Sequence, residues 1–570
     1  MKLVDYDGKL LIIRIKSSYQ EEWKELLSTV KELSGRTFIK ARSVWTALPT
    51  KENIEHLRIF GFEFSDNCCQ LFGEQKEFEV PYNTINVDVE KLNGLLPYQI
   101  DGVKFVEWRN GRALIADQCG LGKTIQALGY LKIHPELRPA LVICPAVMKI
   151  KWMREAKKWL NERVDIFMGM TPCELQDQNI SIFNYDILAE GDAEIRKEEE
   201  QRKKEAKEVG LPYRKKTIPI HGWYEEIIKT DYKIMIIDEC QNLSSQSAIR
   251  TRAYKELKDN IDKIILLSGT PMKNRPEEFF TALNTVEPEI FSNHYAYLHR
   301  YCDLKYNGFG WVPSGKLSNG DELRRLVKPL LIAREKKDVL KDLPEKRDII
   351  IPLYCEEEFR SDYEKQTEAF TEWMNAIEKR SDNEIKNEVE HLKQLAYLMK
   401  RKQMIKWIEE FLETTGEKLV VFANHRKAIE DLNEVFKKYN PVLLYGGVGD
   451  KKRQEAVDSF QNDEKVKLFI GQIQAAGVGI DLFAASNSAF VEFVWSPVDH
   501  EQAGSRLHRI GQKNAVNNYY FVAVNTIEER IVELLQTKMR NINFLVKGEE
   551  EEFIDASILK EITKDFKKEK

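Results

Sequence analysis

The chain has 570 residues, which is enough for three or more domains with cores of their own. Its 87 basic and 92 acidic residues give a net charge of −5, so any nucleic-acid binding must rely on local basic patches rather than on overall charge. The eight cysteines include no Cys-x-x-Cys pair and indicate neither zinc nor a disulfide framework; without a signal peptide or an apolar run of 18 residues, we expect neither secretion nor a membrane span.

The first 75 residues predict a small α+β domain. Residues 9–15 and 35–49 have the apolar character of strands, and residues 21–33 have the apolar spacing of a helix. Residues 53–64 suggest a second helix and a further strand. A linker over residues 76–91 would join this domain to the rest of the chain.

The string DQCGLGKT is typical of a phosphate-binding loop. Gly120 and Gly122 leave room for backbone N–H groups to approach triphosphate oxygens, and the helical spacing that follows would place the phosphates at a helix N-terminus. Lys123 would neutralise the β- and γ-phosphates, and Thr124 would offer a hydroxyl to Mg²⁺. A Gly-rich turn without a ligand is the alternative, because the general pattern has Gly where this chain has Asp117. The predicted ATP contacts in the loop are Asp117, Gln118, Cys119, Gly120, Leu121, Gly122, Lys123 and Thr124.

Two carboxylates follow a buried-strand pattern further along the chain. Four apolar residues, Ile234 to Ile237, precede Asp238 and Glu239, as expected for a parallel strand that is buried on both faces. Ligands bind at the carboxyl ends of such strands, so Asp238 would hold Mg²⁺ and Glu239 would accept a proton from the attacking water. A solvated strand end is the alternative.

The string LLSGTP ends a third apolar strand and would place Ser268 and Thr270 at the same sheet edge. These hydroxyls would sense the γ-phosphate, and an ordinary exit from a strand is the alternative. The three strings together predict an α/β lobe over residues 92–330. Its charged stretch at residues 189–216 is expected to form a solvated insertion helix.

The second half repeats the alternation of strands and helices. Residues 401–535 predict a second doubly wound lobe without a phosphate loop. A helical protrusion and linker over residues 331–400 would precede it, and a tail over residues 536–570 would follow. The predicted fold class is therefore α/β, with two parallel-sheet lobes, helical protrusions and the small N-terminal domain.

Two arginines are candidates for a catalytic role in this second lobe. Arg506 and Arg509, in the string QAGSRLHRIGQ, lie three residues apart, so we expect them on one helix face. A guanidinium pair facing the phosphates would stabilise charge that develops on the γ-phosphate, whereas two surface arginines are the alternative. Gly479 and Asp481, in the string AAGVGIDL, are further predicted nucleotide contacts.

These strings, in this order, resemble those of a Swi/Snf-type DNA translocase of helicase superfamily two. The resemblance covers residues 92–535 and implies two RecA-like lobes that hydrolyse ATP with Mg²⁺ and move on duplex DNA. LPYQ resembles the family's adenine-reading motif, which implies that Gln99 contacts the base. LIAREKKDVLKDLPEK resembles the interlobe stretch. The first 75 residues resemble the HepA-related domain of the annealing-helicase branch.

The resemblance also implies DNA contacts in three parts of the chain. In the N-terminal domain they would be Arg36, Lys40, Arg42 and Trp45, at a junction of single strand and duplex; a protein-docking domain with a core Trp is the alternative. The segment CPAVMKIKWMREAKKW resembles one that grips a DNA strand, and FVWSP resembles a Trp-Asn-Pro element. The implied contacts in the lobes are Pro145, Lys149, Tyr185, Arg426, Arg453 and Trp495, with Trp152 and Glu155 also matching the family.

Three sites depart from the family's pattern. Gln241, a candidate catalytic residue, stands where His is common, and its amide can hydrogen-bond across the cleft but cannot titrate. Cys119 stands where Met is common, and we expect packing rather than a reactive thiol. Gly504 and Ser505 replace an acidic pair, which affects the expected helix pairing before the first arginine.

We therefore predict a monomeric, ATP-dependent translocase on double-stranded DNA that remodels forks or junctions by annealing or fork regression. The alternatives are a strand-separating helicase and a motor that displaces proteins or RNA polymerase from DNA, with the N-terminal domain as a protein-docking module. A non-catalytic scaffold is disfavoured by the intact Lys123, Asp238, Glu239, Arg506 and Arg509. We expect the protein in the cytoplasm of a bacterial or viral host cell, or in the nucleus of a eukaryote.

Overall fold

The computed structural model describes residues 2–7, 9–15, 20–40, 42–50, 53–54, 56–57, 60, 62–65, 81–175, 179–209, 218–306, 311–354, 359–367, 382–477 and 479–548. Parts of the predicted segments lie outside these residues, among them 66–75 of the N-terminal domain and some residues of the second helix expected within 53–64. Others are 76–80 of the linker, 176–178 and 307–310 of the first lobe, 210–216 of the insertion, 355–358 and 368–381 of the interlobe stretch, and 549–570 of the tail. The chain divides into two compact units. The first comprises Met1–Ala116, Lys123–Cys144 and Glu155–Ala333, and the second comprises Asp117–Gly122, Pro145–Arg154 and Arg334–Lys570.

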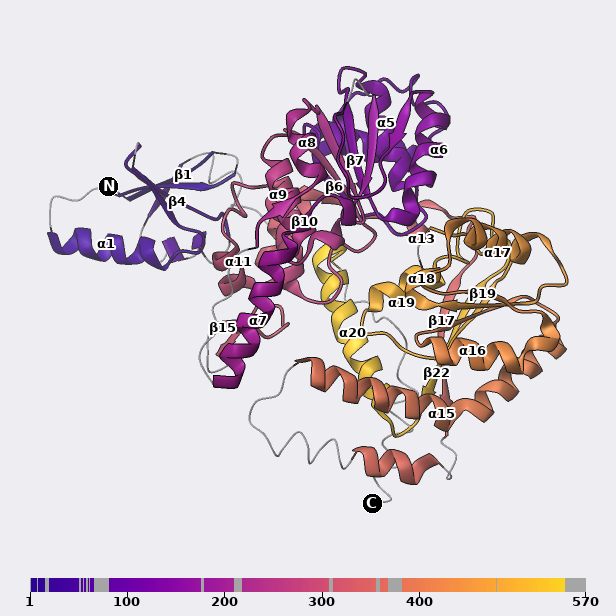
Figure 1. Ribbon diagram of the computed structural model, residues 1–570. Helices are drawn as coiled ribbons and strands as arrows, with labels where there is room; N and C mark the ends of the chain where they lie inside the picture. Colours follow the sequence, from indigo (N-terminus) through magenta and orange to yellow (C-terminus); the bar gives the residue numbers. More distant parts are fainter. Residues whose placement is uncertain are drawn as a thin grey trace. The chain divides into compact units, whose positions relative to one another are not determined.

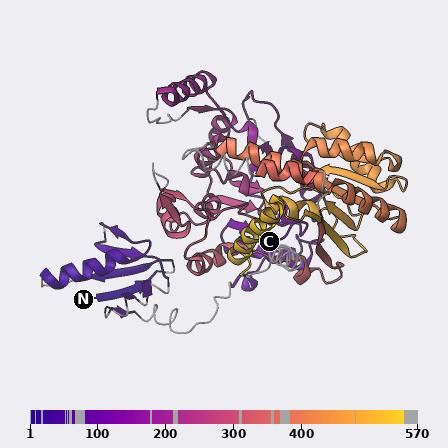
Figure 2. The ribbon, with the colours of Figure 1, turned by 90° about the horizontal axis from the view of Figure 1, so that it is seen from below.

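The N-terminal domain is a five-stranded sheet with one long helix, α1 (Gln20–Glu32), along one face (Figures 1 and 2). The strand order is β3-β4-β2-β1-β5, and all neighbours are antiparallel except β1 and β5. Its core includes Val4, Ile13 and Leu26. The α+β prediction is confirmed, although β1 was not expected. The strands are β1 (Lys2–Tyr6), β2 (Leu11–Ile15), β3 (Thr37–Ile39), β4 (Val44–Ala47) and β5 (Glu63–Phe64).

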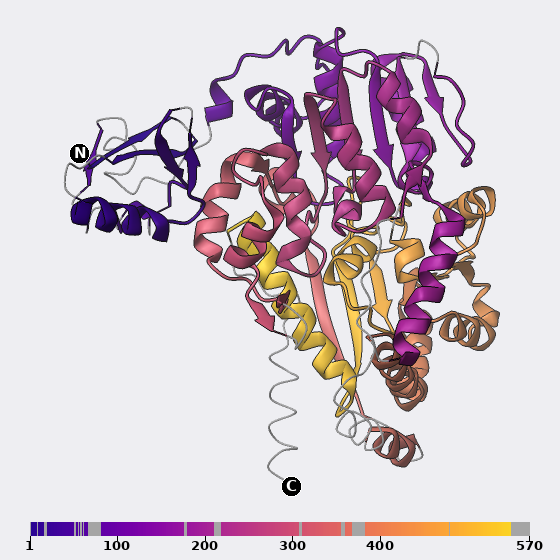
Figure 3. The same cartoon turned by 60° about the vertical axis from the view of Figure 1, so that its left-hand side comes forward.

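A seven-stranded sheet of the order β16-β6-β13-β12-β7-β9-β8 forms the centre of the first unit (Figure 3). Every neighbouring pair is parallel, as predicted from its short, continuous apolar strands. The strands are β6 (Arg112–Ile115), β7 (Ala140–Cys144), β8 (Val164–Ile166), β9 (Ile180–Asn184), β12 (Ile234–Asp238), β13 (Lys263–Leu267) and β16 (Leu331–Ile332). Helices α4 (Pro97–Trp108), α5 (Lys123–Ile133), α8 (Trp223–Lys229), α9 (Ile249–Lys258) and α10 (Phe280–Val286) accompany them.

A six-stranded parallel sheet of the order β17-β22-β21-β18-β20-β19 forms the centre of the second unit. Helices α15 and α16 bury apolar side chains against it, including Met404, Ile408 and Leu432. The predicted doubly wound lobe is confirmed. The elements are β17 (Lys346–Leu353), β18 (Leu419–Ala423), β19 (Val442–Leu444), β20 (Leu468–Gln472), β21 (Asn487–Phe490), β22 (Val516–Ala523), α15 (Asp382–Thr415), α16 (Arg426–Val435), α17 (Asp450–Asn462), α18 (Ile473–Ala476), α19 (Pro497–Gly504) and α20 (Ile527–Val546).

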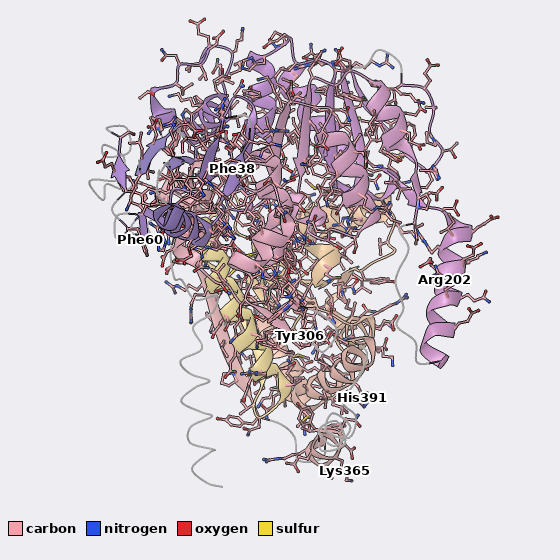
Figure 4. The ribbon with its side chains drawn as sticks, turned by 90° about the vertical axis from the view of Figure 1, so that its left-hand side faces the viewer. Phe38, Phe60, Arg202, Tyr306, Lys365 and His391 are labelled. Atoms are coloured by element: carbon pink, nitrogen blue, oxygen red, sulfur yellow. The ribbon has the colours of Figure 1, made fainter. Side chains whose placement is uncertain are left out.

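The remaining elements extend from these sheets or connect their strands. Helix α7 (Ala193–Val209) forms the expected insertion helix; Arg202 on it is labelled in Figure 4. Two short antiparallel ribbons are β10 (Glu190–Gly191) with β11 (Ile220–His221), and β14 (Leu304–Tyr306) with β15 (Trp311–Pro313). The other helices are α6 (Lys149–Leu160), α11 (His294–Tyr301), α12 (Gly320–Val327) and α13 (Lys336–Val339). Within the described ranges, no helix is long and apolar enough to cross a membrane.

A buried ion pair ties α15 to the start of α20. Lys400 Nζ donates to both carboxylate oxygens of Glu528 at 2.7 Å and to the Phe521 carbonyl at 2.7 Å. The side chains of Lys400 and Glu528 are 0% and 2% exposed. Glu528 also accepts the backbone N–H of Ala523 at 2.8 Å, so this pair fixes the helix relative to the end of β22.

Replacing Lys400 by Met should destabilise the second unit by about 3–5 kcal/mol, because it leaves a buried carboxylate without its counter-charge. The double variant Lys400→Met/Glu528→Gln should recover most of this loss, because the amide oxygen still accepts from Ala523. Chemical denaturation measures both. Arg360→Ala, which breaks an exposed pair with Glu364, serves as the control and should change stability by less than about 0.5 kcal/mol.

Candidate active site

The two predicted carboxylates lie where β12 ends. β12 and β13 pair in parallel with Asp238 opposite Leu267, so the residues that follow both strands leave the sheet at one edge. Asp238 is 5% exposed. Glu239 adopts a left-handed conformation (φ 53°, ψ 54°) and precedes a short 3₁₀ helix, Cys240–Leu243. A side-chain-bearing residue rarely adopts this conformation, which concentrates at functional sites.

Gln241 connects the Glu239 carboxylate to the LLSGTP string, which is predicted to sense the γ-phosphate. Its Nε2 donates to Glu239 Oε2 at 2.5 Å, and its Oε1 accepts from Ser268 Oγ at 2.6 Å. Ser268 Oγ accepts the backbone N–H of Thr270 at 3.0 Å. The path from Glu239 to Thr270 therefore runs through an amide that does not titrate, which is what Gln provides where the family commonly has His.

Tyr185, predicted as a DNA contact, supports the same turn. It is 4% exposed, and its hydroxyl donates to the carbonyls of Asp238 at 2.5 Å and Glu239 at 3.3 Å. Burial raises its pKa well above the usual value, which keeps the hydroxyl a donor. Tyr185 thus holds the backbone of the carboxylate turn, and its contact with DNA stays a prediction.

The phosphate loop begins with a buried ion pair that sequence reasoning did not identify. Asp117 is 0% exposed, and Arg334 binds it with Nε at 3.0 Å from Oδ1 and an Nη at 2.5 Å from Oδ2. The Arg334 backbone N–H also donates to Asp117 Oδ1 at 3.1 Å. Two parallel bonds to a carboxylate fix orientation as well as position. Asp117 therefore anchors the loop where the general pattern has Gly.

Lys336 lies against the middle of the loop. Gly120 and Gly122 have φ of 97° and 79°, which favours glycine at both positions, and a Cβ at Gly120 would lie 3.2 Å from Lys336 Cε. The Lys336 backbone N–H donates to Gln118 Oε1 at 2.9 Å, and its Nζ donates to the His508 carbonyl. Burial lowers the pKa of Lys336 to about 7. This lysine connects the loop to the segment that carries the two arginines.

The arginines do not share a helix, so that part of the prediction is wrong. Helix α19 ends at Gly504, and Arg506 and Arg509 follow in turns. A tertiary contact contributes to this end of the helix. A Cβ at Gly504 would lie 2.7 Å from Asn518 Nδ2 on β22, so the position favours glycine, which has little helix propensity. Arg506 is 5% exposed.

Arg509 and Asp481, predicted separately, form an ion pair. An Nη of Arg509 donates to Asp481 Oδ1, with the side chains 14% and 45% exposed. Arg453 donates to the Ala475 carbonyl at 2.7 Å and so contacts the end of α18 in the same string. Gly479 has φ 77°, and a Cβ there would lie 3.3 Å from Met148 Sδ. Two residues of the AAGVGIDL string, Ala475 and Asp481, therefore contact Arg453 and Arg509 respectively.

Trp495, another predicted DNA contact, lies beside the charged side chains of Glu390 and Lys393. Its Nε1 donates to Glu390 Oε1 at 3.3 Å, and Lys393 Nζ lies 5.7 Å from its ring centroid. His425 contacts Glu390 Oε2 at 2.9 Å with Nε2 and Glu492 Oε1 at 2.6 Å with Nδ1. Hydrogen bonds to Glu390 and Glu492 raise the pKa of His425 to about 9. The imidazole is thus a cation between two carboxylates.

Other predicted contacts have mainly local roles in this structure. Gln99 is 4% exposed, and its Oε1 accepts the backbone N–H of Leu96 at 3.0 Å at the N-terminus of α4. Lys123 and Thr124 begin α5, as expected for the end of a phosphate loop. Lys149 is 7% exposed at the start of α6. Cys119 is half-buried, and Pro145 precedes a 3₁₀ turn. Their ligand contacts stay predictions.

The charged candidates are more exposed. Arg426 donates to Glu430 at 2.8 Å and lies 4.8 Å from the Tyr445 ring. Arg36, Lys40 and Arg42 are exposed on the N-terminal domain, whereas Trp45 is half-buried and packs against its core. These residues therefore present cations to solvent, and their DNA contacts also stay predictions.

Two parallel-sheet lobes with a phosphate loop and a carboxylate turn define a two-lobed motor of the RecA-like class. The chain belongs to the SNF2 family of helicase superfamily two: the SNF2-related domain matches residues 98–409, and the helicase conserved C-terminal domain matches residues 399–511. This confirms the resemblance drawn from the motifs.

The relatives and a solved structure show how far the similarity extends. The chain is 29% identical over 462 residues to the DNA annealing helicase and endonuclease ZRANB3 of Homo sapiens, covering 80% of this chain and 41% of that protein. It is 28% identical to the SWI/SNF-related matrix-associated actin-dependent regulator of chromatin subfamily A-like protein 1 homolog of Caenorhabditis elegans, covering 92% of this chain and 74% of that protein. The chain thus spans about two fifths of the ZRANB3 relatives. The Sulfolobus solfataricus SWI2/SNF2 ATPase core in complex with dsDNA is similar at 24% identity and a TM-score of 0.37, over 83% of this chain and 96% of that chain.

Replacing Gln241 by Ala should lower kcat for ATP about tenfold, because it removes the hydrogen bonds that orient Glu239 and Ser268. The KM for ATP should change little, since the amide orients the base and does not hold the nucleotide. Steady-state ATP hydrolysis measures both constants. Gln246→Ala, which removes a bond to Thr281 in the same unit, is the matched control. A large rise in KM with unchanged kcat would contradict this role.

The His425 cluster should make stability depend on pH. Because the folded pKa of about 9 lies above the ordinary value of about 6.5, the stabilisation is complete below pH 6.5 and is lost as pH rises through 9. We expect the unfolding free energy to fall by on the order of 3 kcal/mol across this window. His425→Gln should remove the dependence, whereas the exposed His221→Gln should keep it. Denaturation series between pH 6 and 10 test this.

Proposed function

We propose that this protein is an ATP-dependent translocase on double-stranded DNA that remodels forks or junctions. The observation that carries the proposal is the hydrogen-bonded path from Glu239 through Gln241 to Ser268, which links a catalytic base to a coupling string in a chain of the SNF2 family. A relative named as a DNA annealing helicase supports the choice of forked DNA.

The chain's own residues suit a phosphoryl transfer to water. Glu239 would accept the proton of the attacking water, and its left-handed backbone and bond to Gln241 hold the carboxylate in one orientation. Lys123 would neutralise charge on the β- and γ-phosphates. Arg506 and Arg509 would stabilise the charge that develops on the γ-phosphate, a contribution on the order of 10³ to 10⁵ in rate for an arginine finger.

The oxygen donors also suit Mg²⁺ bound together with a nucleotide. Asp238 ends β12, and Thr124 lies in the first turn of α5. Among the described residues, no group of three or more His, Cys, Asp or Glu could hold a metal by itself. Mg²⁺ is commonly bound by one or two protein oxygens plus phosphates, and here it would neutralise charge on the nucleotide. Asp238 and Thr124 would be those protein ligands.

Thr270 supports the proposed sensing role of the SGTP string. Its hydroxyl oxygen is buried and has no hydrogen-bond partner among the described residues, while its backbone N–H is held by Ser268. Buried hydroxyls normally have a partner. A nucleotide phosphate, or a water that it positions, would provide one and so report the nucleotide state to Gln241.

Fork recognition would involve the N-terminal domain. Arg36 and Arg42 are exposed on the same domain as Phe38, which is 48% exposed and whose ring centroid lies 5.1 Å from that of Trp45. Cations beside an aromatic surface suit phosphates and unpaired bases. We propose this face as a DNA contact; a protein-docking role is the alternative.

The test is steady-state ATP hydrolysis with no nucleic acid, single strand, plain duplex and forked duplex. We expect little turnover without DNA and the highest turnover with the fork. Glu239→Gln should lower turnover by about 10²-fold or more, because it removes the general base. Glu434→Gln, at a position 76% exposed, is the control and should turn over normally.

Two outcomes would contradict the proposal in different ways. Turnover that no DNA stimulates would exclude a DNA translocase. Equal stimulation by plain and forked duplex would retain the translocase and exclude preference for forks.

A further inference from the structure

The β14–β15 ribbon exposes two large aromatic side chains at its far end. Tyr306 and Trp311 are directly opposite each other across the antiparallel pair, and they are 62% and 59% exposed. Their ring centroids lie 5.8 Å apart in an edge-to-face arrangement. No other tryptophan in the part of the chain that the structure describes is as exposed as Trp311. Tyr306 is labelled in Figure 4.

The ribbon projects from its surroundings on both faces. Side chains alternate along a strand, so Lys305 and Val312 point away from the face of Tyr306 and Trp311. Val312 is 39% exposed and Lys305 is exposed as well. A two-stranded ribbon that is solvated on both faces gains little stability from burial in the core. Its conformation therefore depends on the contacts at the base of the ribbon.

The base of the ribbon is held firmly between α11 and α12. Ser314 donates its backbone N–H to the Asp303 carbonyl at 3.0 Å and its hydroxyl to Asp303 Oδ2 at 2.7 Å. Next to this contact, α11 is joined to α12: the Tyr301 hydroxyl donates to Glu322 Oε1 at 2.7 Å, and Arg300 pairs with the same carboxylate. Glu322 is 2% exposed, so this connection is buried. The aromatic pair therefore sits on a rigid support.

The charges around the ribbon favour a polyanion. Lys305 and Lys316 are exposed, and the side chain of Arg275 lies beside Gly315, 3.8 Å from where a Cβ would be. Of the acidic groups nearby, the Asp303 carboxylate accepts one hydrogen bond, from the Ser314 hydroxyl, and Glu277 pairs with Arg275 at 3.6 Å. Lys305, on the face opposite the aromatic pair, and Lys316, in the turn that follows the ribbon, are thus exposed cations of this element.

We propose that the β14–β15 ribbon is a base-stacking element, on which Tyr306 and Trp311 stack with unpaired bases next to a duplex. The inference rests on the proposed function, in which the polymer is DNA. Every base offers a flat face, so such stacking is independent of sequence, and the exposed lysines of the same element would contact the phosphates on either side. The element would give a duplex translocase a grip on the single strand at a fork.

A cross-strand aromatic pair can also serve only to stabilise its own ribbon, by a few tenths of a kcal/mol up to about 1 kcal/mol. The variants must therefore separate flat rings from apolar bulk. Tyr306→Leu/Trp311→Leu keeps apolar contact across the ribbon and removes the flat rings. Tyr306→Phe/Trp311→Phe keeps flat rings of similar placement. Tyr295→Leu, at a position 63% exposed on α11, is the matched control.

The experiment measures binding of the full-length protein, without nucleotide, to a forked duplex and to a plain duplex. The fork carries 2-aminopurine as its first unpaired base, and stacking quenches this fluorophore. We expect the double Leu variant to bind the fork about tenfold more weakly and to lose the quenching, with binding to plain duplex unchanged. The double Phe variant and Tyr295→Leu should resemble the wild-type protein.

Fork binding and quenching that survive in the double Leu variant would overturn the proposal and leave the ribbon as a protein-docking surface. Equal loss in the double Phe variant would also overturn it, because flat rings would not be sufficient. Hydrolysis of ATP on plain duplex is measured alongside. Absence of hydrolysis in the wild-type protein would contradict the proposed motor function. A normal rate in the double Leu variant would show that the motor is intact, so that any loss of fork binding is due to the ribbon.

Discussion

The parallel register of β12 and β13 is the constraint on which the carboxylate turn, Asp238 and Glu239, depends. Because Asp238 stands opposite Leu267, the chain leaves both strands at the same edge, and Gln241 can reach Ser268 with a single amide. A register shift of one residue would turn these side chains to the other face of the sheet. The buried apolar strands thus determine the chemistry at their ends, since their packing decides which polar groups meet.

The second unit depends on a different interaction, the buried pair of Asp117 and Arg334. A carboxylate with no exposure must be fully paired, and Arg334 meets that requirement with its side chain and its backbone N–H. The same stretch carries Lys336, which reaches Gln118 and His508. Arg334 and Lys336, two residues apart in one charged segment, therefore hold the phosphate loop and contact the segment with the two arginines. The composition of this segment does not indicate these contacts.

The surfaces proposed for DNA differ in construction from these sites. Gln241, Ser268 and Asp117 are buried and hydrogen-bonded, whereas Phe38, Tyr306 and Trp311 leave aromatic rings in solvent. Exposed aromatic area is unfavourable for a protein alone and becomes favourable when a partner covers it. Rigid supports for such rings limit the entropy that binding must overcome. In this way the chain separates the groups proposed to hydrolyse ATP from the groups proposed to contact DNA.

The sequence by itself determined the fold class, the order of the motifs and the family, because apolar strands, glycines with required backbone freedom and paired carboxylates each leave a local pattern. It predicted Glu239, Gln241 and Ser268 as separate candidates. Only the tertiary structure joined them, since their contact depends on strand register. It also placed Arg506 and Arg509 after α19 rather than on a helix, and it revealed Arg334 as the partner of a distant carboxylate. Pairing between residues far apart in the chain follows from packing, and no local pattern encodes it.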